Sequence, residues 1–147
     1  MGTLPLFSPQ SVNETFSLYS DGGARGNPGP AGIGYVLYDS KGRTVEENGE
    51  VLGITTNNQA EYKALLKGLQ VALDLGVKTI ICHLDSELIV KQLQGRYKVK
   101  NEGLLPLFKE AKALLRQFEK TTVVHVRREK NKRADALVNA ALDGEIL

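Results

Sequence analysis

The sequence predicts an α/β domain in which a five-stranded mixed sheet is flanked by helices. Three strand-like segments follow one another without a helix between them, which favours an antiparallel meander. The later strand-like segments are separated by helical ones, which favours parallel crossovers. The chain has 147 residues, of which 41% are hydrophobic and 24% are charged, and these values suit one globular domain with a single core.

Five segments have the pattern of strands, and they are residues 16–21, 33–38, 44–52, 79–84 and 121–127. The first alternates apolar and polar side chains and stops at two glycines. The third is more polar, as at a sheet edge, and the fourth is mostly apolar, as in the middle of a sheet. Residues 26–30 have the composition of a loop, and residues 39–42 that of a hairpin turn.

Apolar residues recur at helical spacing in residues 62–73, 89–93, 104–118 and 134–142. Asn58 and Glu61 have the spacing of a capping box at the start of the first helix, and Gly76 is placed to end it. Asp85 and Ser86 are placed to cap the second helix. The predicted order of elements is therefore β-β-β-α-β-α-α-β-α, with no internal repeat.

The remaining features limit the class of protein. Residues 1–15 contain two prolines and no periodicity, so we expect a mobile tail ahead of a single domain over residues 16–147. The net charge of +2 neither requires nor excludes a polyanionic partner. One cysteine, Cys82, excludes an internal disulfide framework, and no segment reaches the roughly 20 apolar residues of a membrane span. We therefore expect a cytoplasmic protein without membrane contact.

Four carboxylates lie at the ends of predicted elements. Asp21 ends the first strand and Asp85 follows the fourth, while Glu61 and Asp135 lie near the starts of helices. Carboxyl ends of parallel strands and N-termini of helices gather at one edge of such a sheet, so the four side chains could converge there. Clustered carboxylates repel one another, and Mg²⁺ or Mn²⁺ offsets that repulsion with the oxygen ligands it prefers. A site of this kind suits phosphoryl chemistry.

Each of these acids also has a local explanation. Asp21 could only begin a turn, and Glu61 could only complete the capping box. Asp85 could only cap a helix, and Asp135 could only complement a helix dipole. The residues around the four acids decide between these explanations and a shared site.

Short motifs surround the acids, and they read YSDGGARGNPG at 19–29, TTNNQAEY at 55–62, LDS at 84–86 and NKRAD at 131–135. Together, in this order, they resemble type 1 ribonuclease H over residues 16–143. The resemblance implies a ribonuclease H-like fold and a metal-dependent endonuclease that hydrolyses the RNA strand of RNA–DNA hybrids, giving 5′-phosphate and 3′-hydroxyl ends. It implies two Mg²⁺ (or Mn²⁺) ions, bound with substrate. The implied catalytic residues and metal ligands are Asp21, Glu61, Asp85 and Asp135.

The resemblance also implies contacts with both strands of the hybrid. The matching positions are Gly22, Gly23, Asn27, Thr56, Asn57, Asn58 and Gln59. The 2′-hydroxyls that distinguish RNA lie in the minor groove, which small and short polar residues can approach. The local alternative is that the glycines serve turn geometry and that Asn58 only caps a helix. The basic residues within 91–100 could steer phosphates or could form a solvated loop.

One loop departs from the family pattern. Many members carry a histidine before the fourth carboxylate, whereas residues 127–133 contain none. His125 has an offset used by some members, but it alternates with valines in a predicted strand, so we expect it not to reach the carboxylates. Arg128 or Glu129 could stand in for the missing group.

Three other functions are compatible with these residues. The chain could be a hybrid-binding module without catalysis, a related nuclease or strand-transfer enzyme acting on another duplex, or a metal-dependent phosphatase acting on small molecules. The four acids disfavour a pure binder, because such a protein would gain from losing their repulsion. No obligate protein partner is evident, and we expect a monomer.

Overall fold

The computed structural model describes residues 14–144, so most of the predicted N-terminal tail lies outside the described residues. The strands are β1 (Thr15–Ala24), β2 (Gly29–Tyr38), β3 (Thr44–Thr55), β4 (Thr79–Leu84) and β5 (Lys120–His125). The helices are α1 (Asn57–Asp74), α2 (Glu87–Leu93), α3 (Leu105–Leu115), the 3₁₀ helix η2 (Arg128–Lys130) and α4 (Lys132–Leu142). The predicted order of strands and α-helices is confirmed.

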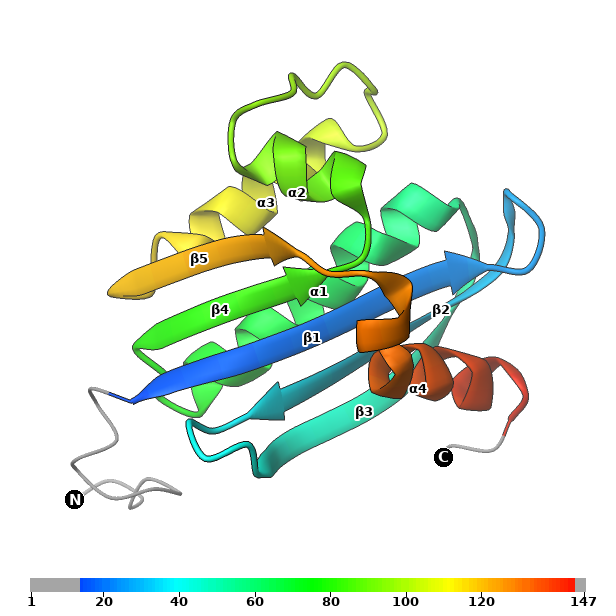
Figure 1. Cartoon of the computed structure of the whole chain (residues 1–147). Coiled ribbons are helices and arrows are strands. Elements are labelled where there is room, and N and C mark those ends of the chain that lie inside the picture. Colours follow the sequence, from blue (N-terminus) through cyan, green and yellow to red (C-terminus); the bar gives the residue numbers. More distant parts are fainter. Residues whose placement is uncertain (1–13, 145–147) are drawn as a thin grey trace.

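The five strands form one mixed sheet in the order β3-β2-β1-β4-β5 (Figure 1). The pairs β1–β2 and β2–β3 are antiparallel, whereas β1–β4 and β4–β5 are parallel. The predicted meander and crossovers are therefore both present. This order makes β1 and β4 parallel neighbours, and the end of β4 lies beside Ser20 of β1, so the residues that follow Ser20 and Leu84 are also neighbours.

Helices cover both faces of the sheet. Figure 1 shows α1 behind the sheet and α4 in front of it, over β2 and β3. Strand alternation sends one set of side chains toward α1, and these form the main core with apolar residues of α1, α2 and α3. Its fully buried members include Phe16, Leu18, Leu37, Tyr62, Leu65, Leu69, Ile80 and Ile89. The Tyr62 hydroxyl donates a hydrogen bond to Oε1 of buried Gln92 at 2.6 Å, so the largest of these side chains is also satisfied.

Close packing of α4 depends on a glycine in β2. A Cβ atom added to Gly34 would lie 2.3 Å from the carbonyl oxygen of Ala134, which is far inside van der Waals contact. The absence of that atom lets the first turn of α4 rest directly on the sheet. Asp135, the residue after Ala134, is therefore held close to the part of β1 where Asp21 pairs with Gly34.

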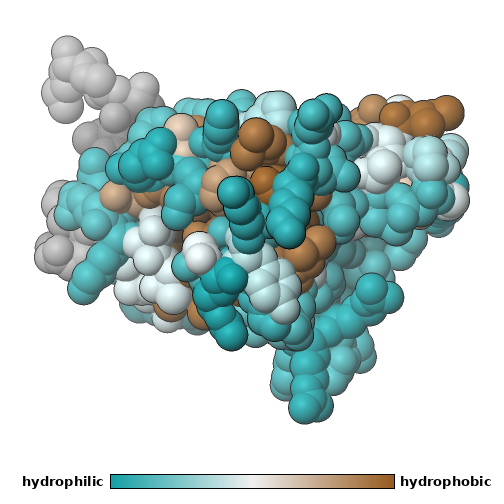
Figure 2. All heavy atoms as spheres, turned by 90° about the horizontal axis from the view of Figure 1, so that it is seen from above, coloured by the Kyte–Doolittle hydropathy of each residue, from teal (hydrophilic) through white to brown (hydrophobic). Residues whose placement is uncertain are grey.

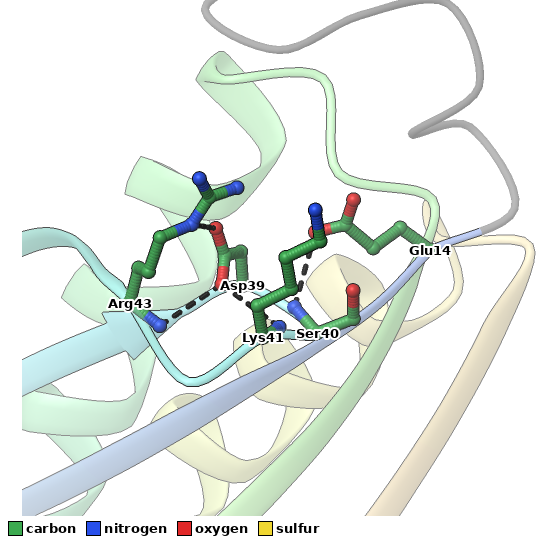
Figure 3. Close-up of polar contacts among 5 residues, drawn as sticks. All are labelled: Glu14, Asp39, Ser40, Lys41 and Arg43. Carbon is green, nitrogen blue, oxygen red and sulfur yellow. Dashed lines mark hydrogen bonds and ion pairs between the residues drawn. The ribbon is translucent and has the colours of Figure 1, made fainter.

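The hairpin between β2 and β3 is closed by a single carboxylate (Figure 3). Asp39 Oδ1 accepts hydrogen bonds from the backbone N–H groups of Lys41 and Arg43, both at 2.9 Å, and Oδ2 pairs with Arg43 Nε at 2.7 Å. Beside it, Glu14 Oε2 accepts from the backbone N–H of Ser40 at 3.0 Å. These contacts confirm the predicted turn and fasten the start of β1 to it.

Several boundaries differ from the prediction. β1 continues through the glycines to Ala24, because these residues pair with Ala31–Ile33 of β2 and glycine tolerates a strand as well as a turn. β2 accordingly begins at Gly29, inside the predicted loop. β5 ends at His125 rather than at residue 127. None of the helices in residues 14–144 combines the length and apolar character that a membrane crossing requires.

Candidate active site

Three of the four predicted acids meet at one edge of the sheet. Asp21 lies in β1 and Asp85 directly follows β4, and the register places Ser20 opposite Leu84, so the two aspartates are neighbours. Glu61 reaches them from the second turn of α1. One carboxylate oxygen from each of the three residues lies within 4.8 Å of the other two. The convergence expected from strand and helix ends is confirmed for this group.

The position of Glu61 depends on close approach between β1 and α1. A Cβ atom on Gly22 would lie 2.2 Å from the carbonyl oxygen of Ala60, so only glycine allows this approach. The backbone N–H of Gly22 then donates a hydrogen bond to Glu61 Oε1 at 2.5 Å. The predicted capping box is wrong: Thr56 is the N-cap, and its hydroxyl accepts from the N–H of Gln59 at 3.2 Å. Glu61 is thus directed into the site and not back to Asn58.

Asp85 is likewise not the cap of the helix that follows it. Ser86 is the N-cap of α2, and its Oγ accepts from the N–H of Ile89 at 3.3 Å. The Asp85 carboxylate instead accepts a hydrogen bond from Asn131 Nδ2 at 3.1 Å. Helix capping therefore accounts for Ser86 but not for Asp85, whose carboxylate belongs to the acidic cluster.

Asp135 lies in the first turn of α4, outside the group of three but in the same hollow. Its side chain and its charge both act on Asp21 and raise the pKa of that carboxyl. Asn139, one turn further along α4, has its Nδ2 3.4 Å from Asp135 Oδ2. All four predicted acids therefore line one hollow of about 410 Å³.

Burial raises the pKa of two of these groups. The pKa of Asp21 rises from 3.8 to about 7, chiefly because the side chain is desolvated and then because Asp85 is negatively charged. The pKa of Glu61 is raised well above its ordinary value, again by burial first and by Asp21 and Asp85 next. Within residues 14–144, none of the four acids forms an ion pair with a lysine or arginine. Buried oxygen ligands without a counter-charge fit a hard divalent cation.

The predicted substrate-contacting residues lie around this hollow. Gly22, Gly23, Asn57 and Asn58 line it. Asn27, Thr56 and Gln59 line an adjacent hollow of about 340 Å³, which Asn57 and Asn58 share. The two hollows thus form a continuous polar surface on either side of the start of α1.

Hydrogen bonds fix part of this surface. Asn57 Oδ1 accepts from the N–H of Ala24 at 2.7 Å, and the N–H of Asn57 donates to Asn27 Oδ1 at 3.0 Å. These contacts tie the loop between β1 and β2 to the start of α1. Asn58 lies exposed beside them, so the structure does not use it as a cap.

Sequence reasoning overlooked several residues of the site. Arg25 and Asn139 also line the acidic hollow, and Asn101 and Leu104 line the adjacent one. Arg25 Nη1 pairs with Asp143 Oδ1 at 2.7 Å, which connects the β1–β2 loop to the end of α4. Asparagine alone carries no sequence signal for such a role, because it is also common in turns and caps.

His125, Arg128 and Glu129 were the residues considered for the role of the family's loop histidine, and one of them lines the acidic hollow. Arg128, in η2, is a lining residue of that hollow. Glu129 lies 4.0 Å from Arg127 in an exposed ion pair. His125 borders a different hollow, with Glu87, Lys91 and others, so the expectation that it does not reach the carboxylates is confirmed.

The basic residues within 91–100 lie at the end of α2 and in the segment that joins α2 to α3. Seen from above, the surface over these elements is mostly hydrophilic, with smaller hydrophobic areas between (Figure 2). Lys91 pairs with Glu87 at 2.7 Å and lies 5.0 Å from the ring centre of Tyr97. Its charge is therefore partly compensated within the protein.

Comparisons with known proteins agree with this geometry. A family model described as "Reverse transcriptase-like" matches residues 19–141. Ribonuclease HI of Halobacterium salinarum is 46% identical over 125 residues, which are 85% of this chain and 63% of that protein. A bifunctional protein of Mycobacterium tuberculosis is 45% identical over 127 residues, 86% of this chain and 35% of that protein. The chain thus spans less than two thirds of the length of either relative.

Solved structures show the same fold at similar identity. The N-terminal RNase H domain of the Mycobacterium tuberculosis protein, solved as a fusion with maltose-binding protein, matches with a TM-score of 0.87 and 40% identity, covering 90% of this chain and 96% of that one. LC11-RNase H1, solved in complex with an RNA/DNA hybrid, matches with a TM-score of 0.84 and 46% identity, covering 88% and 97%. With the family model, the sheet order and the acidic cluster in agreement, the chain belongs to the type 1 ribonuclease H family.

Proposed function

We propose that this protein is a metal-dependent endonuclease that hydrolyses the RNA strand of RNA–DNA hybrids and leaves 5′-phosphate and 3′-hydroxyl ends. The observation that carries the proposal is the cluster of Asp21, Glu61 and Asp85, whose oxygens lie within 4.8 Å of one another without a cationic partner among the described residues. Family membership and the hybrid bound to LC11-RNase H1 support the choice of duplex.

The proposed ligands are the four acids of the hollow. Asp21, Glu61, Asp85 and Asp135 would hold two Mg²⁺ or Mn²⁺ ions together with the substrate. When bound, such ions supply an activated water and stabilise the leaving 3′-oxygen. The protein's own part is to hold the carboxylates correctly spaced, and the Gly22 N–H does this for Glu61 and opposes the rise that burial causes in the pKa of that carboxyl.

The side chains around the acidic hollow favour a mechanism in which water, and not a protein side chain, attacks the phosphodiester. Among the described residues, neither histidine nor the single cysteine lines the acidic hollow. Cys82 is buried in β4, and the His83 ring stacks on Tyr19 with 4.2 Å between ring centres. Both therefore serve packing. Ser86 lines the hollow, but its hydroxyl is engaged as the N-cap of α2, so hydrolysis assisted by carboxylates is the chemistry that fits.

The polar surface beside the acids would recognise the hybrid. Gly22, Gly23 and the Asn57–Asn58 pair present backbone and short amides to a minor groove, where the RNA 2′-hydroxyls lie. Asn27, Thr56 and Gln59 would contact the strand that passes over the adjacent hollow. Arg128 would contribute a positive charge facing the scissile region, and we propose it as the residue that stands in for the missing histidine.

A cleavage assay on matched duplexes tests the proposal. RNA–DNA, RNA–RNA and DNA–DNA duplexes of one sequence would be incubated with and without Mg²⁺, and the product ends mapped. We expect Mg²⁺-dependent cutting of the RNA strand in the hybrid. Binding without cutting would instead identify a hybrid-binding module, and cutting of another duplex would identify a related nuclease.

We further propose that the protein acts as a monomer in the cytoplasm. The single cysteine is buried, so the described fold needs no oxidising compartment. The acidic hollow is completed within one chain by β1, α1, α4 and the residue after β4. Light scattering at the assay concentration would check this, since a dimer would contradict it.

A further inference from the structure

Asn131 is a buried polar residue between η2 and α4, and its side chain is 1% exposed. Its backbone carbonyl accepts the hydrogen bond from the N–H of Asp135 at 3.1 Å, which starts the helix that carries Asp135. The same residue therefore lies at the origin of α4 and deep in the protein. Such a position is unusual for an amide, because an amide with unmet hydrogen-bonding capacity loses free energy on burial.

The side-chain amide bridges two other parts of the site. Asn131 Nδ2 donates to the carbonyl oxygen of Ser20 at 2.9 Å and to Asp85 Oδ2 at 3.1 Å. Both partners are acceptors only, so the amide must present its nitrogen to them and cannot be flipped. Within residues 14–144, no other group donates a hydrogen bond to the Asp85 carboxylate.

This orientation leaves the other half of the amide without a partner. Asn131 Oδ1 is buried and accepts no hydrogen bond from the described residues. An apolar side chain of the same volume would avoid that unsatisfied acceptor, so packing alone does not explain asparagine at this position. The two donated hydrogen bonds are what an apolar side chain would lose.

We propose that Asn131 is a positioning residue whose side-chain amide fixes the Asp85 carboxylate against β1 at Ser20, the residue before Asp21. Its backbone carbonyl also accepts from the N–H of Asp135, so one residue links three of the four acids, two of them through its side chain. The proposal rests on the proposed function in one respect, namely that these acids hold the catalytic cations.

The test compares two substitutions with a control. Asn131→Leu keeps the branched shape and the number of heavy atoms and removes the donor, whereas Asn131→Ala removes both the donor and the branched end of the side chain. Ile80→Val is the control, because Ile80 is fully buried at the opposite end of β4 from Asp85 and its truncation weakens the fold away from the site. For each protein, Mg²⁺ binding without substrate would be measured by titration calorimetry, kcat and KM on an RNA–DNA hybrid by cleavage, and the melting temperature by circular dichroism.

We expect both Asn131 variants to bind Mg²⁺ roughly 10–100-fold more weakly and to lose kcat by a similar factor, with KM for the hybrid within about twofold. Ile80→Val should keep its Mg²⁺ affinity and kcat although its melting temperature falls. If Asn131→Leu binds Mg²⁺ and turns over like the wild type, the proposal is overturned. An equal loss of Mg²⁺ affinity in Ile80→Val would also overturn it, because the effect would then report only on stability.

A measurement on the unaltered protein covers the case in which neither variant folds. The Asn131 side-chain amide signals in an NMR spectrum should shift when Mg²⁺ saturates the protein, because the amide donates directly to Asp85. Unchanged amide signals at saturating Mg²⁺ would contradict the proposal. If the wild type cleaves no hybrid, the proposed function fails, whereas the calorimetric and NMR results still decide the role of Asn131.

Discussion

At the scale of single residues, Asp21 combines a buried position with a negative neighbour on each side. Replacing it by the isosteric amide, Asp21→Asn, should lower kcat by more than ~10³-fold, because a negative ligand at the centre of the cluster is lost. Asp74→Asn, at the exposed end of α1, should leave kcat unchanged. The measurement is single-turnover cleavage of a hybrid at fixed Mg²⁺, and near-normal turnover of Asp21→Asn would contradict the four-carboxylate site.

The raised pKa of Asp21 also makes a prediction about stability. Its pKa is 3.8 in an unfolded chain and about 7 in the metal-free protein, so the native state binds this proton more tightly. The resulting contribution to the free energy of unfolding is fully present below about pH 4 and is lost as the pH rises through 7. In EDTA, the melting temperature of Asp21→Asn should therefore exceed that of the wild type at pH 8 and approach it at pH 4. A pH-independent difference between the two proteins would refute this.

A third prediction concerns the loop before Asp135. Arg128→Ala should reduce kcat/KM by about tenfold or more, since Arg128 lines the acidic hollow. His125→Ala and Glu129→Ala should stay within about tenfold of the wild type, less than the ~10²–10⁴ of a lost general acid or base. All three would be compared on one hybrid at one salt concentration. A loss above a thousandfold for His125→Ala alone would show that His125 is the functional histidine.

At the scale of elements, α4 depends on the missing side chain of Gly34. In Gly34→Ala the new methyl group would meet the Ala134 carbonyl at 2.3 Å, and the helix would have to move away from the sheet. We expect the melting temperature to fall by roughly 2–12 °C, because overpacking typically costs ~1–3 kcal/mol and each kcal/mol shifts the melting temperature of a chain of this size by about 2–4 °C. Gly23→Ala is a suitable control for thermal melts, since its nearest neighbour would be Asn57 Oδ1 at 3.9 Å. Equal melting temperatures would show that α4 adapts freely.

The order and the type of the elements could be predicted from the sequence, because the spacing of apolar residues distinguishes helices from strands and the glycines mark the segments between them. The 79–84 strand is reproduced to the residue, since it is an apolar run bounded by polar caps. The predicted end of the first strand at its glycines is wrong, because Gly22 and Gly23 are equally compatible with a turn and with pairing to β2. The helix cap was assigned to Asn58 instead of Thr56 because threonine and asparagine are both good caps.

The four acids were predictable because strand ends and helix starts can be located from local patterns. The residues that hold them could not be predicted in the same way. Asn131 contacts Ser20 and Asp85 across 111 and 46 positions of sequence, and no local pattern encodes such pairs. Arg25 and Asn139 are of the same kind, since their roles depend on where α4 comes to lie.

At the scale of the whole molecule, binding of a cation should stabilise the fold. A ligand that binds the native state alone raises the free energy of unfolding by mass action, by about 2.7 kcal/mol at a hundred times its Kd. Calorimetric scans with and without millimolar Mg²⁺ should therefore show a higher melting temperature with the cation. Glu61→Gln should lose most of that shift. An unchanged wild-type melting temperature would mean that the cation enters only with the nucleic acid.

The packing of α4 onto β2 has a consequence for the timing of synthesis. Asp21 lies in β1 and Asp135 in α4, so a nascent chain cannot close the acidic hollow until α4 has left the ribosome. The sheet has all five strands before that moment, while Asp85 still lacks the Asn131 amide. The proposed nuclease site is therefore complete only after α4 has been synthesised and packs on Gly34.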